Sequence, residues 1–163
     1  MGESVAEELD HAALLRPFLA GRWRSRYDAV RPGSARRAEL FNKLCHSYAE
    51  VLDWRYARPA GADLVKELRE LGAGARCYCL CGPAGLDGRE VPLAEAVAAL
   101  AGRGLPVLLV CRPGALAYFE PEYESGAGRR YILQRPGAEP GAVPAGGAAR
   151  LSRGHGSPGP AGT

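Results

Sequence analysis

The sequence predicts an α+β fold in which N-terminal helices pack on a small mixed sheet of about four strands. Two observations support this prediction. Through residues 4–72, apolar side chains recur at helical spacing. From residue 76 onward they gather in short runs of strand length, separated by turns rich in glycine, proline and acidic residues. The resulting order is helices, then a strand, a helix and three further strands, which is typical of α+β proteins.

Four helices are expected in the first half of the chain. Each carries leucines or aromatic residues on one face, and together they cover about residues 4–21, 22–30, 34–52 and 63–72. Ser4 precedes Glu7 by three residues, which is the spacing of a capping box at a helix N-terminus. Asp63 is a suitable N-cap residue for the fourth helix, and Gly72 is placed to end it.

The second half of the chain contains the strands, which are expected at residues 76–81, 105–111, 115–120 and 130–135. A helix from Leu93 to Gly102 connects the first strand to the second, so these two strands can be parallel neighbours with a right-handed crossover. The segment before this helix, residues 86–92, is interpreted as a turn centred on Asp87 and Gly88. The last three strands are interpreted as an antiparallel meander.

Residues 4–135 are expected to form a single α+β globular domain, followed by a tail. The tail, residues 136–163, is rich in glycine, proline and alanine, and its large apolar side chains are Val143 and Leu151. Such a segment buries too little apolar surface to offset the entropy that ordering costs. We therefore expect the tail to be disordered.

Composition excludes several classes of function. Lys and Arg number 21 and Asp and Glu 18, so no global field marks the chain as a nucleic-acid or membrane protein. No segment approaches the ~20 apolar residues of a membrane helix, and the N-terminus is acidic where a secretory signal would be basic. The five cysteines are an odd number without the density of a disulfide scaffold. This pattern favours a reducing, cytoplasmic setting.

The segment RCYCLC places Cys77, Cys79 and Cys81 on alternate positions. In an extended strand such residues lie about 6.6–6.8 Å apart along one face. Thiolates on one zinc ion lie under about 4 Å from one another, and a disulfide needs Cβ atoms about 3.5–4.5 Å apart. A metal or redox site would therefore need a partner from another strand, and Cys111 is the candidate. Buried, unreactive thiols are the preferred interpretation, with the metal or redox site as the alternative.

Residues 22–58 carry nine basic and four acidic side chains, with aromatic residues between them. Basic side chains interleaved with aromatics can contact phosphates and stack on bases. On a helix, however, Trp23, Tyr27 and Val30 form one apolar stripe, and the neighbouring arginines then form an ordinary solvated face. This second interpretation is preferred. If the protein has an anionic partner, the residues predicted to bind it are Arg22, Arg26, Arg36 and Arg37.

Five acidic residues lie at expected turns or strand ends: Asp87, Glu90, Glu120, Glu122 and Glu124. A converging pair of them could bind a divalent cation or act in acid–base catalysis, but their spacing matches no known metal loop. Cys45 and His46 are adjacent, yet helical neighbours diverge by about 100°, which argues against a nucleophile–base pair. The chain also lacks a glycine-rich phosphate-binding loop. We therefore expect no catalytic residues, no metal and no cofactor.

Three blocks of the sequence resemble a family of small bacterial proteins of unknown function. They are LDGREVPLAEAV, GRGLPVLLVCRPGALAYFE and RRYILQR, preceded by a helical region similar to RWRSRYDAV and LDWRYA. The resemblance covers about residues 18–135, and the fold that it implies agrees with the one argued above. It implies a bacterial protein but no activity, substrate or catalytic residue.

These features favour a non-enzymatic, cytoplasmic protein that binds a macromolecular partner. Two alternatives belong to other classes of function. One is a nucleic-acid-associated protein that uses the basic region Arg22–Arg37. The other is an enzyme with a carboxylate or thiol site at the strand ends of the sheet. Membrane association is not expected.

Overall fold

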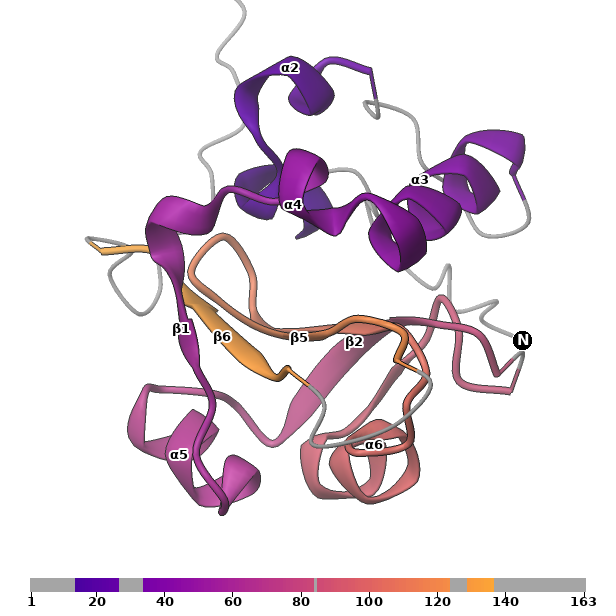
Figure 1. Ribbon diagram of the computed structural model, residues 1–163. Coiled ribbons are helices and arrows are strands. Elements are labelled where there is room, and N and C mark those ends of the chain that lie inside the picture. Colours follow the sequence, from indigo (N-terminus) through magenta and orange to yellow (C-terminus); the bar gives the residue numbers. More distant parts are fainter. Residues whose placement is uncertain (1–13, 27–33, 84, 124–128, 137–163) are drawn as a thin grey trace, which may run out of the picture.

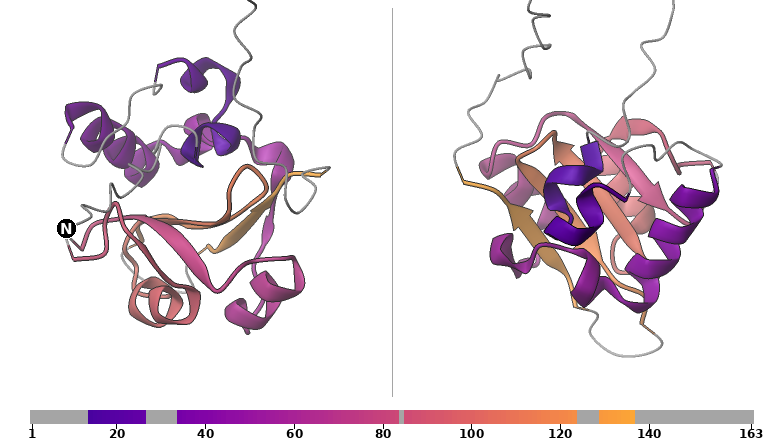
Figure 2. Two further views of the ribbon diagram at one scale, coloured as in Figure 1. Left: turned by 180° about the vertical axis from the view of Figure 1, so that it is seen from behind. Right: turned by 90° about the horizontal axis from the view of Figure 1, so that it is seen from above.

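The computed structural model describes residues 14–26, 34–83, 85–123 and 129–136. In this part of the chain, a six-stranded sheet lies between two layers of helices (Figures 1 and 2). The predicted α+β class is confirmed. Residues 4–13 of the expected domain and residues 137–163 of the expected tail lie outside the described residues.

The sheet is antiparallel throughout, in the order β1-β6-β5-β4-β2-β3. Its strands are β1 (Ala57–Pro59), β2 (Arg76–Cys81), β3 (Glu90–Pro92), β4 (Val107–Arg112), β5 (Leu116–Glu120) and β6 (Tyr131–Gln134). Four of them, β2, β4, β5 and β6, coincide closely with the strands that the sequence predicts.

Two features of the predicted sheet are wrong. The structure adds β1 and β3 at the two edges, and each is three residues long, too short to show the alternation that identifies a strand. In addition, β2 and β4 are antiparallel neighbours, with Leu80 paired to Leu108, rather than parallel ones. The reason is that the chain reverses at Gly88 (φ +72°) and forms β3 before α6 (Leu93–Leu100) begins. Helix α6 therefore starts from the end of the sheet at which β2 begins, not from the end at which β2 stops.

The first layer of helices consists of residues 14–26 and 34–56 and covers one face of the sheet (Figure 1). Its elements are η1 (Arg16–Phe18), α2 (Gly21–Arg24), α3 (Ala35–His46), α4 (Tyr48–Val51) and η2 (Trp54–Tyr56). The single helix expected at residues 34–52 is divided at Ser47, which departs from helical geometry (φ −139°, ψ 30°). The Ser47 N–H still donates to the Lys43 carbonyl oxygen at 2.7 Å, so α3 ends there and α4 follows at once.

The second layer consists of α5 (Leu64–Glu70) and α6, and it covers the other face of the sheet (Figure 2). Asp63 caps α5 as predicted, and its carboxylate accepts a hydrogen bond from the Lys66 N–H at 3.2 Å. Gly72 (φ +93°) follows α5 and Gly102 (φ +73°) follows α6, because the left-handed conformation after a helix suits glycine. Among the described residues, no helix has the length and apolar character needed to cross a membrane.

The sheet has a hydrophobic core on each face, because alternate strand residues point to opposite sides. Tyr78 and Leu80 of β2 pack in the same cluster as Leu40 and Leu44 of α3. The three cysteines of β2 pack in the other cluster, with Leu93 and the rest of the buried face of α6. The end of β2 is therefore covered by α3 on one side and by the second layer on the other.

Candidate functional site

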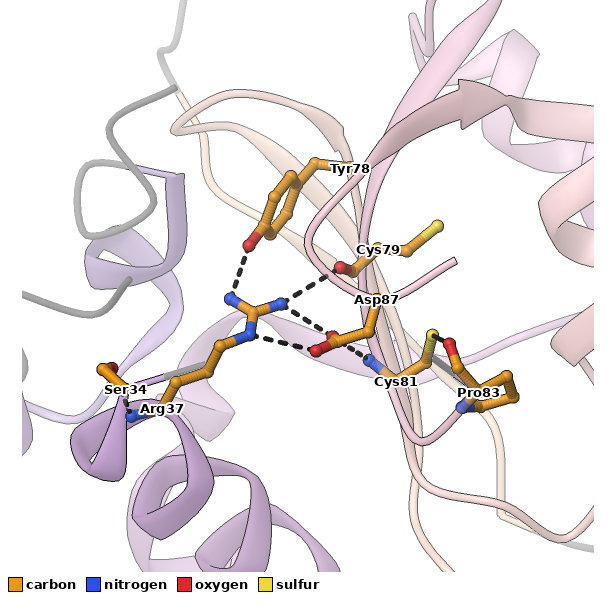
Figure 3. Close-up of polar contacts among 7 residues, drawn as sticks. All are labelled: Ser34, Arg37, Tyr78, Cys79, Cys81, Pro83 and Asp87. Carbon is orange, nitrogen blue, oxygen red and sulfur yellow. Dashed lines mark hydrogen bonds and ion pairs between the residues drawn. The ribbon is translucent and has the colours of Figure 1, made fainter. Parts of the chain in front are cut away.

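A buried arginine joins the first layer to the sheet (Figure 3). Arg37 lies in the first turn of α3 and is only 3% exposed. This turn is capped by Ser34, whose hydroxyl oxygen accepts a hydrogen bond from the Arg37 N–H at 3.1 Å. The cap holds the start of α3 in place, and the Arg37 side chain points toward the end of β2.

The Arg37 guanidinium donates hydrogen bonds to three residues. Its Nε and Nη2 atoms lie 3.2 Å and 2.7 Å from the two carboxylate oxygens of Asp87, which is the bidentate geometry that favours arginine–carboxylate pairs. Nη1 lies 2.5 Å from the Tyr78 hydroxyl oxygen, and Nη2 lies 3.3 Å from the Cys79 carbonyl oxygen. Because Arg37 and Asp87 are 50 residues apart in the chain, the pair fixes α3 to the loop between β2 and β3.

Asp87 also fastens this loop to β2. Its Oδ1 accepts a hydrogen bond from the Cys81 N–H at 3.0 Å, whereas Oδ2 accepts only from Arg37 Nε among the described residues. Burial by itself lowers the pKa of Arg37, but the hydrogen bond to Asp87 and the nearby charges more than offset burial, so the pKa is raised. Burial raises the pKa of Tyr78 to about 12. Neither Arg37 nor Tyr78 therefore exchanges a proton near neutral pH.

A cavity of about 250 Å³ lies beside the Arg37–Asp87 pair, between α3 and the end of β2. Ala38, Phe41 and Leu80 supply its apolar lining, and the Arg37–Asp87 pair supplies its charged groups. A mostly apolar wall with a few fixed polar groups is the usual composition of a small-ligand site.

The four cysteines of the strands are buried on the face that the second layer covers: Cys77, Cys79, Cys81 and Cys111. All four are free thiols. In the register of β2 and β4, Tyr78 and Val110 form the last pair, and Cys111 lies just beyond it, where β4 has a bulge. The predicted burial of these thiols is confirmed.

The surroundings of Cys79, Cys81 and Cys111 keep these three thiols protonated. Burial raises the pKa of Cys81 and of Cys111 to about 12. A hydrogen bond with Cys77, together with burial, raises the pKa of Cys79. A protonated thiol is a poor nucleophile and a poor metal ligand. Within the described ranges, no three His, Cys, Asp or Glu side chains are grouped so that they could hold a metal ion.

The acidic residues at the strand ends that the structure describes do not converge. Asp87 faces the first layer, whereas Glu120 is fully buried on the side of the second layer. The Glu120 carboxylate accepts hydrogen bonds from the Tyr118 hydroxyl at 2.5 Å and from the Gly102 N–H at 2.8 Å. Glu120 therefore connects the end of β5 to the end of α6.

The remaining members of that acidic set are dispersed. Glu90 lies on the edge strand β3, 3.8 Å from Arg76 Nε. Glu122 is exposed, and Glu124 lies outside the described residues. His46 is exposed at the end of α3, so it has no enclosed environment in which to act as a base.

The structure separates the four arginines predicted to bind an anion. Arg37 is the buried partner of Asp87, whereas Arg22, Arg26 and Arg36 are exposed on the first layer. Arg22 forms an ion pair with Glu50 at 3.1 Å, and Arg26 forms one with Glu39 at 2.5 Å. Arg36 Nη1 donates to the carbonyl oxygen of Arg26 at 3.2 Å and has no carboxylate partner in the described part of the chain.

A group that we call the Trp23 cluster brings three cations around one indole ring. The distances to the ring centroid of Trp23 are 5.7 Å for Arg22 Cζ, 5.2 Å for Arg26 Cζ and 6.0 Å for Lys43 Nζ. Lys43 comes from α3, and no carboxylate among the described residues pairs with it. The sequence did not indicate Lys43, because only the packing of α3 against α2 brings it to this ring.

The two layers of helices differ in charge. The described residues of the first layer, 14–26 and 34–56, include eight basic and three acidic side chains. Those of the second layer and its flanks, 60–75 and 93–106, include three basic and four acidic side chains. All three acidic residues of the first layer already pair with arginines, and a hydrogen bond from Arg55 holds the pKa of one of them, Asp53, below its ordinary value.

Compared with protein-family models, with curated proteins and with solved structures, the chain finds no match. The resemblance to a bacterial family stays a prediction. The function of the protein therefore has to be inferred from its geometry and charge.

Proposed function

We propose that this protein is a non-enzymatic binding protein whose first layer binds a nucleic acid. The residues that contact the phosphates are Arg22, Arg26, Arg36 and Lys43. The observation that carries the proposal is the difference between the two layers, a net charge of +5 in the described first layer against −1 in the second. Three of these cations are held around the single ring of Trp23.

The Trp23 cluster favours an anionic partner for a physical reason. Three cations within 6.0 Å of one ring centroid give this part of the surface a positive potential, which attracts a phosphate. The ion pairs with Glu39 and Glu50 are exposed, and exposed pairs contribute only about 0–1 kcal/mol. Arg22 and Arg26 can therefore exchange these carboxylates for phosphates at little cost in folding stability.

Other ways of binding a macromolecule have less support. Both edge strands are short and carry a proline, Pro59 in β1 and Pro92 in β3, which discourages a partner from adding a strand to the sheet. Among the described residues, Leu105 is the only exposed large hydrophobic residue. Protein–protein interfaces usually have an apolar core, so the described surface suits a charged polymer better than a folded protein.

Catalysis has less support than binding. Cys81 and Cys111 are buried with raised pKa values, and Asp87 and Glu120 are engaged in hydrogen bonds that hold elements together. Asp87, Glu120 and these two buried thiols are therefore poor candidates for catalytic groups.

The proposal predicts steeply salt-dependent binding of a labelled DNA oligonucleotide, measured by fluorescence anisotropy. With four phosphate contacts to a single strand, log K should fall against log salt concentration with a slope of about −3. The triple variant Arg22→Gln, Arg26→Gln and Lys43→Gln should reduce the slope to about −1, because it removes three of the four contacts.

The matched control is Lys66→Gln, Arg69→Gln and Arg103→Gln, which removes the same charge from the second layer and should leave the slope unchanged. Equal losses in the two triple variants, or no binding by the unmodified protein at low salt, would overturn the proposal. Competition by poly-glutamate as effective as that by unlabelled DNA would also overturn it, in favour of an acidic protein partner.

A further inference from the structure

We infer that the cavity beside Arg37 and Asp87 receives one unpaired base of a single-stranded nucleic acid. This inference rests on the proposed function, because the base would belong to a strand whose phosphates lie on the first layer. It adds a class of ligand, the single strand, and a site for it that is separate from the phosphate contacts.

The size of the cavity suits one heterocycle. Its volume is about 250 Å³, whereas a cavity of about 150 Å³ holds one benzene molecule and drug-sized ligands occupy about 300–1,000 Å³. A single base therefore fits, and a complete dinucleotide cofactor does not.

The lining of the cavity suits a neutral, planar group with N–H donors. Phe41, Ala38 and Leu80 offer apolar contacts to the faces of a base. At the charged end, Asp87 is 27% exposed, and its Oδ2 accepts one hydrogen bond, from Arg37. A carboxylate oxygen can accept two hydrogen bonds, so Oδ2 is free to accept one more from a base amino or imino group. Because Arg37 neutralises Asp87, a neutral base suits this end better than an ionic ligand does.

Gly82 forms part of the cavity wall, next to Phe41. A Cβ atom at this position would lie 3.8 Å from Phe41 Cζ and, apart from the adjacent residues of the chain, would meet no other atom within 4 Å. The glycine therefore leaves the edge of the Phe41 ring uncovered, and a larger side chain there would cover it.

The cavity and the basic surface adjoin on the same helix. Arg37 and Ala38 of the first turn of α3 line the cavity, and the neighbouring Arg36 is exposed and hydrogen-bonded to Arg26. Successive residues of a helix point about 100° apart, so the phosphate contacts and the cavity lie on adjacent faces of α3. A strand that places a phosphate at Arg36 can therefore place its base at Phe41.

A single strand should consequently bind more tightly than a duplex of the same sequence at the same salt concentration. In a duplex the bases are paired and stacked, and a base must be extruded before it can enter a pocket. We expect a single-strand preference of about tenfold, the usual effect of one stacked base, measured by anisotropy with matched labelled DNA.

The variant Gly82→Leu tests the cavity itself, and Gly85→Leu is its matched control. Gly85 lies in the same loop and has no atom within 4 Å of an added Cβ. Gly82→Leu should reduce the single-strand preference to about twofold or less and leave the salt slope unchanged, because the phosphate contacts remain. Gly85→Leu should preserve the preference. Thermal unfolding of both variants verifies that they are folded.

A second pair of variants approaches the cavity from its other wall. Ala38→Leu should also abolish the preference, whereas Asn42→Leu, which adds the same side chain elsewhere on α3, should not. The inference fails, and the proposed function stands, if single strand and duplex bind alike with the expected salt slope. It fails in the same way if Gly82→Leu and Ala38→Leu both keep the preference. If neither form of DNA binds, the proposed function fails, and this inference fails with it.

Discussion

Arg36 and Arg37 are adjacent and chemically identical, yet they have different roles. Arg36 is exposed on the first layer, whereas Arg37 is buried with its guanidinium on Asp87. The helical rotation between neighbouring positions turns one side chain toward solvent and the other toward the sheet. The sequence places both in a basic region. It does not show which of the two pairs with a carboxylate 50 residues further along the chain.

At the residue scale, Arg37→Met should destabilise the fold strongly. The substitution leaves Asp87 without its charge partner, and breaking a buried ion pair costs about 3–5 kcal/mol. Because the Asp87 side chain is partly exposed, we expect the lower end of that range, about 3 kcal/mol, in the free energy of unfolding by urea. Arg36→Met, an exposed control, should change it by less than about 0.5 kcal/mol. Similar losses in the two variants would contradict the assigned role of Arg37.

At the element scale, the longer elements follow from local signals and the shorter ones do not. The helix α5 has its N-cap at Asp63 and a left-handed glycine at Gly72, both visible in the sequence. The edge strands β1 and β3 carry no such signal, because three residues are too few for a period of two to be recognised. They form because a neighbouring strand offers hydrogen-bonding groups, which is a property of the assembled sheet.

The end of α5 provides a prediction at this scale. Gly72→Ala should lower the free energy of unfolding by about 1–2 kcal/mol, because a side chain is strained at φ +93°. An added Cβ would also lie 2.7 Å from Arg112 Nη1, but the end of this flexible side chain can shift, so the contact adds little to the cost. Gly74→Ala is the control, because no atom lies within 4 Å of its added Cβ. Chemical denaturation of both variants measures the difference, and an equal effect at the two glycines would refute this account.

At the scale of the whole molecule, burial of the thiols makes stability depend on alkaline pH. Cys81 and Cys111 have pKa values of about 12 in the folded protein, against about 8.5 in the unfolded chain. Between these values the unfolded chain has lost the thiol proton and the folded protein keeps it. The thiols therefore contribute fully below about pH 8.5, and their contribution is lost as pH rises toward 12.

The expected slope is a fall of up to about 1.4 kcal/mol in the free energy of unfolding per pH unit for each thiol. Urea denaturation at several pH values between about 8 and 10 measures it. Above about pH 10, ionisation of Tyr78 in the unfolded chain acts in the same direction, because burial also raises the pKa of this residue to about 12. The variant Cys111→Ala should have a shallower slope. An unchanged slope in this variant would show that the Cys111 thiol does not contribute to the pH dependence.

The distribution of charge also depends partly on the sequence and partly on the fold. A net positive region between residues 22 and 58 can be counted in the sequence. Only the fold gathers it on one face of the sheet, brings Lys43 beside Trp23 and removes Arg37 from the surface. Three of the four proposed phosphate contacts, Arg22, Arg26 and Arg36, are among the residues that the sequence predicts to bind an anion, and the binding itself stays a prediction.

By itself, the sequence determined the α+β class, the four longer strands, the capped helix α5 and the burial of the strand thiols. Each of these depends on periodicity or on residues a few positions apart, which a linear chain records directly. The tertiary structure alone decided the direction of β4 relative to β2, the two edge strands, the Arg37–Asp87 pair and the cavity beside it. These features depend on groups far apart in the chain, and they exist only once β3 has reversed the chain and α3 has packed on β2.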